Sequence, residues 1–193
     1  STALYLTIVP FLVMAVSVWW KRTAVLRKVL NGYYAVVAFI LALAFVADTS
    51  LYPFWGFKLD ASCLQFLSTP GDAFASVSIG YIVWRVVIIA VVTTVIAVLM
   101  MRRRWHFKVT CRRWIAMLLM VATVPLMVIG IRGGLDESTT NIGQVYFSQN
   151  QFLNHAAVNP VFSFLASMER TASDQTDYHY MDDETCEKLT AQL

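Results

Sequence analysis

The chain has 193 residues, of which 58% are hydrophobic and only 14% are charged, and its formal net charge is +3. A soluble domain is about half apolar and about a quarter charged, so this composition excludes an ordinary soluble domain. Ten of the 15 Lys and Arg residues lie in two stretches, 21–28 and 102–113, that contain no Asp or Glu. Because short Lys- and Arg-rich loops stay cytoplasmic, we predict that both stretches are cytoplasmic loops between membrane helices. Such loops face anionic lipid headgroups, so the positive charge does not indicate nucleic-acid binding.

Four apolar segments predict an all-α membrane protein with four transmembrane helices, since about 20 helical residues cross the hydrocarbon of a bilayer. The segments are 3–20, 29–51, 79–101 and 114–131. Trp19 and Trp20 stand directly before Lys21 and Arg22, an order typical of the membrane interface. The charge rule places the start of the first segment outside the cytoplasm, so we expect one further helix upstream of Ser1.

Residues 52–78, between the second and third segments, are predicted to be extracytoplasmic and partly structured. Aromatic residues suited to the headgroup layer gather at 52–57. Apolar residues spaced by three and four predict a short amphipathic helix over 59–67 that lies flat on the outer surface. A second short helix is predicted over 73–77.

The region 135–193 differs in character from the transmembrane domain 1–134. It holds most of the acidic residues and few aliphatic runs, so it cannot bury a large core by itself. We therefore predict an extracytoplasmic connector that leads to a domain outside this chain. Its predicted helices are 161–168 and 182–193. Cys63 and Cys186 both fall on the outer side, and the sequence leaves open whether they pair, because it does not show their distance.

Three charged residues near the outer ends of the segments are candidates for a lipid-headgroup site: Asp48, Arg85 and Arg132. Ionisable residues within or beside membrane helices are costly and often functional. The alternatives are that Asp48 and Arg85 extend to the headgroups or form an ion pair with each other. No ionisable residue lies in the middle of a segment, which gives little support to a proton relay or an ion pathway.

The residues offer no enzyme chemistry of their own. The chain has no P-loop, no GxSxG and no HExxH motif, and no nucleophile stands beside an activating base. His155, His179 and the acidic run 182–184 lack a recognisable ligand spacing, so we expect no metal site or cofactor in this chain. We expect the isolated chain to be inactive.

Two parts of the sequence are distinctive. The first comprises ADTSLYPFWGFKLD at 47–60 and TPGDA at 69–73, and the second comprises RGG at 132–134, VYFS at 145–148 and LNHAAVNPVFSFL at 153–165. They resemble the membrane region and juxtamembrane connector of lipoteichoic acid synthase-like enzymes of the Bacteroidetes type, which are phosphoglycerol transferases of the sulfatase/alkaline phosphatase superfamily.

The resemblance implies five transmembrane helices followed by an extracytoplasmic α/β catalytic domain with a metal-activated threonine. The chain would then be the membrane anchor, in the bacterial inner membrane, of a phosphoglycerol or phosphoethanolamine transferase, with the threonine and divalent metal in the domain beyond Leu193. Its partners would be the phospholipid membrane and its own catalytic domain. Asn154, His155 and Asn159 are then candidates for docking that domain. The alternatives are a structural membrane subunit and a small transporter.

Overall fold

The computed structural model describes residues 2–20, 22–67, 71, 77–102, 111–135 and 139–174, and these form helices and no strand. The long helices are α1 (Thr2–Trp19), α2 (Thr23–Trp55), α4 (Ile79–Met101) and α5 (Arg113–Arg132). The shorter elements are the 3-10 helices η1 (Ala61–Leu67) and η2 (Ile142–Val145) and the helices α6 (Gln151–Ala157) and α7 (Pro160–Asp174). The prediction of an all-helical fold is confirmed for the described residues.

Among the described residues, α2, α4 and α5 are long and apolar enough to cross a membrane. The predicted bounds of the third segment, 79–101, coincide with α4, and those of the fourth differ from α5 by one residue at each end. The 18 residues of α1 span about 27 Å at 1.5 Å per residue, slightly less than a typical hydrocarbon core.

The second helix is longer than the predicted 29–51, because α2 has 33 residues and continues at both ends. At 1.5 Å per residue it is roughly 50 Å long, which exceeds the hydrocarbon thickness. It ends where Gly56 adopts the left-handed conformation (φ 69°) and donates its N–H to the carbonyl of Tyr52. Because of this length, α2 contacts α1 and α4 in the helix bundle and also α7 in the connector.

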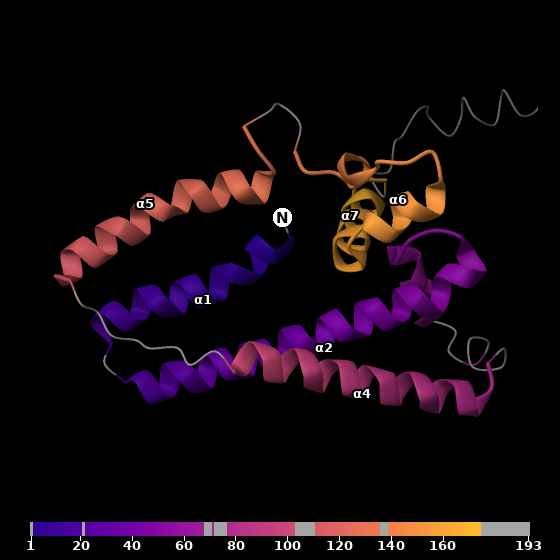
Figure 1. The fold of residues 1–193 in the computed structure, drawn as a ribbon, viewed down its shortest axis with the longest axis horizontal. Coiled ribbons are helices and arrows are strands. Elements are labelled where there is room, and N and C mark those ends of the chain that lie inside the picture. The colour runs from indigo at the N-terminus through magenta and orange to yellow at the C-terminus, as the bar shows by residue number, and fades with distance from the viewer. Residues whose placement is uncertain are drawn as a thin grey trace, which may run out of the picture.

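The helices α1, α2, α4 and α5 run roughly parallel or antiparallel to one another, with α4 along α2 and α5 along α1 (Figure 1). A core forms where α1 and α2 meet the last turn of α4, and its buried members are Val13, Leu26, Leu30 and Tyr34. At the end of the bundle where α1 finishes and α5 begins, the rings of Trp19 and Trp114 pack edge to face, 5.8 Å apart. We call this end, which carries Arg112 and Arg113, the basic end.

The outward faces of α4 and α5 are covered by nothing in the described part of the chain, since neither helix has a buried residue. Large apolar side chains, among them Trp84, Val91, Leu118 and Leu126, are exposed along both helices. Faces of this kind are stable in lipid and unstable in water, which agrees with a membrane protein.

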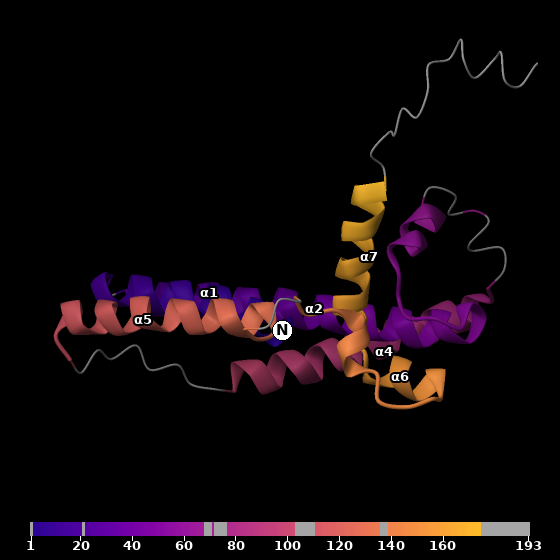
Figure 2. The same cartoon turned by 90° about the horizontal axis from the view of Figure 1, so that it is seen from above.

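The last third of α2 extends beyond α1 and is flanked by η1, α6 and α7 (Figure 1). Figure 2 shows that α7 crosses α2 instead of running along it, so it stands out from the bundle of long helices. We call this the connector end of the molecule. The short elements η1, α6 and α7 lie at this end.

Two predicted short helices differ from the observed ones. The amphipathic helix predicted over 59–67 is a 3-10 helix that begins at Ala61, and it packs against α7 instead of lying alone on a surface. The helix predicted over 161–168 is longer: it begins one residue earlier, at Pro160, where Asn159 caps it, and it continues to Asp174. Most of the helix predicted over 73–77, all of that over 182–193, and Cys186 with its pairing lie outside the described residues.

Candidate functional site at the connector end of α2

A buried ion pair closes the turn that follows α2. The Asp48 carboxylate accepts a hydrogen bond from Lys58 Nζ at 2.5 Å through Oδ2 and from the Leu59 N–H at 2.9 Å through Oδ1. Only 9% of the Asp48 side chain and 12% of the Lys58 side chain are exposed. The left-handed turn at Gly56 brings the chain back along α2, which places Lys58 beside Asp48. The ion-pair partner of Asp48 is therefore Lys58, and the alternative of a pair with Arg85 is wrong.

The same turn is joined to α7. The Ala61 N–H donates to Ser167 Oγ at 2.7 Å, and the Ser167 hydroxyl donates to the carbonyl of Phe164 at 2.7 Å. Ala61 and Ser167 are both buried. A buried N–H with no partner would be costly, so this bond fixes where α7 sits relative to the end of α2.

A second link joins α6 to α2. Tyr52 Oη and His155 Nδ1 lie 3.1 Å apart, and the two rings pack edge to face with centroids 5.8 Å apart. Phe152 and Tyr146 complete an aromatic cluster around this pair, with centroids 5.8 Å from Tyr52 and 6.3 Å from His155. His155 is only 6% exposed. The connector is thus held at two points: α6 contacts α2 through His155 and Tyr52, and α7 packs on α2 and is bonded to η1 through Ser167 and Ala61.

The other two predicted docking residues shape the connector itself. Asn154 Oδ1 accepts the N–H groups of Phe147 at 3.0 Å and Ser148 at 2.8 Å, and its Nδ2 donates to the Ser148 carbonyl at 2.6 Å. Asn159 Oδ1 accepts from the Val161 N–H at 2.9 Å and caps α7. Of the three, His155 is hydrogen-bonded to α2, while Asn154 and Asn159 make hydrogen bonds that order the segments on either side of it. Their docking of a further domain stays a prediction.

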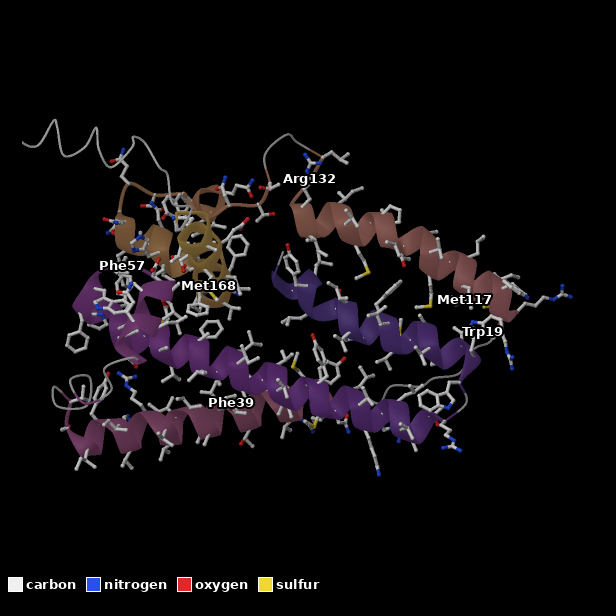
Figure 3. The ribbon with its side chains drawn as sticks, turned by 180° about the vertical axis from the view of Figure 1, so that it is seen from behind. Trp19, Phe39, Phe57, Met117, Arg132 and Met168 are labelled. Carbon is white, nitrogen blue, oxygen red and sulfur yellow. The ribbon has the colours of Figure 1, made fainter. Side chains whose placement is uncertain are left out.

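Asp48, Arg85 and Arg132 lie on three different helices and in different surroundings. The Arg85 guanidinium lies over the ring of Tyr81, 4.7 Å from its centroid, on the side of α4 that faces α2. Arg132 is exposed at the C-terminal end of α5, away from the first half of α4 (Figure 3). The structure therefore does not gather the three residues into one headgroup site.

The backbone around Arg132 is held firmly nonetheless. The Arg132 carbonyl accepts both the N–H and the hydroxyl of Thr140, each at 2.8 Å. Gly133 has φ 97°, and a Cβ there would collide with the Thr140 hydroxyl, so glycine is required at this position. This contact sets the path of the chain from α5 to the connector.

The described residues contain no group of three or more His, Cys, Asp or Glu side chains that could hold a metal ion. His179 and the run 182–184 lie outside the described ranges. Cys63, on η1, is partly buried, and burial together with the negative charge of Asp60 raises the pKa of its thiol. A raised pKa lowers the fraction of thiolate at neutral pH, so this thiol does not suggest a nucleophile.

Sequence reasoning missed Lys58, Ser167 and the polar role of Tyr52. The available signals were weak. Lys58 follows a glycine that ends an apolar helix carrying an acidic residue, and Ser163 and Ser167 lie one turn apart on the buried face of α7. No protein-family model, curated protein or solved structure matches this chain.

Proposed function

We propose that the chain is the N-terminal membrane-anchor domain of a sulfatase-family phospholipid-headgroup transferase. The enzyme would transfer phosphoglycerol or phosphoethanolamine at the outer face of the bacterial inner membrane. The observation that carries the proposal is the attachment of the connector to α2 through the Tyr52–His155 contact and to η1, which follows α2, through the Ala61–Ser167 hydrogen bond. A connector held at two points presents whatever follows α7 at a defined height and orientation.

Such a platform suits a reaction on a lipid headgroup. A catalytic domain held at the leaflet meets its substrate in two dimensions and in a restricted set of orientations, which raises the effective concentration. In this proposal α1, α2, α4 and α5 span the membrane, the basic end is cytoplasmic, and the connector end is extracytoplasmic. A divalent metal belongs to the catalytic domain and not to this anchor.

The native protein in its source membrane provides the test. We expect an antibody against the connector to detect a species several times heavier than the 21.8 kDa of this chain. That species, purified intact, is expected to transfer phosphoglycerol or phosphoethanolamine from a phospholipid only when a divalent metal is present, and chelation should abolish the transfer. A native species of 21.8 kDa would contradict the proposal and favour a structural membrane subunit.

The proposed orientation predicts how two cysteines react. One variant keeps Cys63 as its single cysteine and the other keeps Cys111, which is exposed near the basic end. In intact cells a membrane-impermeant maleimide should label Cys63, whereas Cys111 should react only after permeabilisation. Because only the thiolate reacts and burial raises the pKa of Cys63, its labelling should be slow at pH 7 and accelerate about tenfold per pH unit below that pKa. The reverse labelling pattern would mean that the orientation is inverted.

A further inference from the structure

An apolar cleft lies between α2 and α4 near the connector end, on the side of α2 away from Lys58. Its volume is about 300 Å³, and it is open on one side. Its lining residues are Leu43, Val46, Ala47, Ser50, Val77, Tyr81, Ile82, Arg85, Val86 and Ile89. The described part of the wall is therefore mostly hydrocarbon, and Arg85 is the charged residue among those that line it.

Arg85 is only partly engaged by the described residues. Its guanidinium lies over the Tyr81 ring, and its Nε is buried with no hydrogen-bond partner among them. A buried donor that lacks an acceptor is costly, so an anionic group that reached it would be stabilised. A guanidinium also has donors in a planar fork that fits two oxygens of a phosphate.

The depth of Arg85 suits a lipid phosphate. It lies six residues into α4, about 9 Å along the helix from Ile79 at 1.5 Å per residue. If α4 crosses a bilayer, this position is close to the boundary between hydrocarbon and headgroups, which an arginine side chain can reach. Below it, towards Ile89, the cleft continues as an apolar groove along the two helices.

The charge of the cleft favours one class of headgroup. None of the described residues that line it is acidic, so these residues offer an ammonium group no carboxylate. Asp48, the nearby acid on α2, is buried in its ion pair with Lys58 and does not line the cleft. A headgroup that carries a phosphate and no cation is therefore the better complement.

We infer that this cleft binds one anionic phospholipid, with an acyl chain in the groove between α2 and α4 and the phosphate on the Arg85 guanidinium. The occupant is a phospholipid and not a free phosphate, because the apolar wall contributes only when an acyl chain covers it. The inference depends on the cleft and on Arg85, and it holds or fails independently of any transferase activity.

Native mass spectrometry of the full chain in mild detergent tests the site, with phosphatidylglycerol and phosphatidylethanolamine as probes. The wild-type chain should retain phosphatidylglycerol in preference. Arg85→Gln should weaken its binding about tenfold and abolish the preference, because a charge-assisted contact to phosphate is lost. Arg102→Gln is the matched control, since it removes the same charge from the other end of α4. Arg102→Gln should change neither the binding of phosphatidylglycerol nor the preference for it over phosphatidylethanolamine.

Ala47→Phe is a second variant that fills the groove and leaves Arg85 in place. It should lower the retention of both lipids, and it carries the test if Arg85→Gln does not fold. Glycerol phosphate without acyl chains, at the same concentration as the lipid, should not displace phosphatidylglycerol. The inference is overturned if both variants retain phosphatidylglycerol like the wild type, or if glycerol phosphate competes as well as the lipid itself.

Discussion

Replacing Asp48 with Ala is expected to lower the free energy of unfolding by about 3–5 kcal/mol, because it leaves Lys58 as a buried charge without a partner. The change also removes the acceptor of the Leu59 N–H, which lies in a buried part of the turn. Thermal or denaturant unfolding of the chain in detergent, followed by circular dichroism, measures the loss.

Two further variants separate the charge from the hydrogen bond. Asp48→Asn can still accept from the Leu59 N–H through its Oδ1, so we expect it to be less destabilising than Asp48→Ala. The double variant Asp48→Ala with Lys58→Met should recover much of the loss, since no unpaired buried charge remains. If Asp48→Ala alone costs less than about 1 kcal/mol, the pair behaves as an exposed one and our description of this turn is wrong.

Replacing His155 with Ala is expected to detach α6 from α2 at a cost of about 3 kcal/mol. This cost combines the loss of one hydrogen bond, of edge-to-face packing against Tyr52 and of contact with the tilted ring of Tyr146, together with the cavity left by a buried side chain. Hydrogen exchange of the full chain should show faster exchange across 139–174, with the core around Leu30 unchanged.

The matched control for this prediction is Tyr52→Phe, which removes the hydroxyl and keeps both rings in place. It should cost only about 1 kcal/mol, as expected for a single neutral hydrogen bond. Equal protection of the connector in His155→Ala and in the wild type would show that the α7 contacts alone hold it.

His155→Ala also distinguishes a docking role of His155 from a catalytic role in the longer protein that we propose. If His155 positions the connector, His155→Ala should reduce turnover without abolishing it, and stabilising the connector by other means should restore part of the activity. Abolished turnover with unchanged folding and membrane insertion would contradict the docking role. It would place His155 in direct contact with the reaction.

The long apolar helices could be predicted because their signal is local. A run such as 79–101 has the length and composition of a membrane helix whatever surrounds it, and α4 has those bounds. The second helix was predicted too short at both ends. Its first turns carry Arg27 and Lys28, and its last turn holds Pro53, all of which weaken a hydropathy signal without preventing a helix.

The candidate site could be predicted only in part. Asp48 and His155 stood out as an acid at the end of an apolar helix and as a histidine in a distinctive stretch, and both are buried with polar partners. Their partners could not be found by spacing. Tyr52 and His155 are 103 positions apart, and Ala61 and Ser167 are 106 apart.

The sequence by itself therefore determined the class of the protein and its long helices, because hydrophobic length and charge placement act residue by residue along the chain. The tertiary structure alone decided that Asp48 pairs with Lys58, that Arg85 faces an apolar cleft, and that α6 and α7 are held on α2. The physical reason is that a buried polar group is stable only when a complementary group lies within hydrogen-bonding distance. The path of the whole chain decides which group lies there.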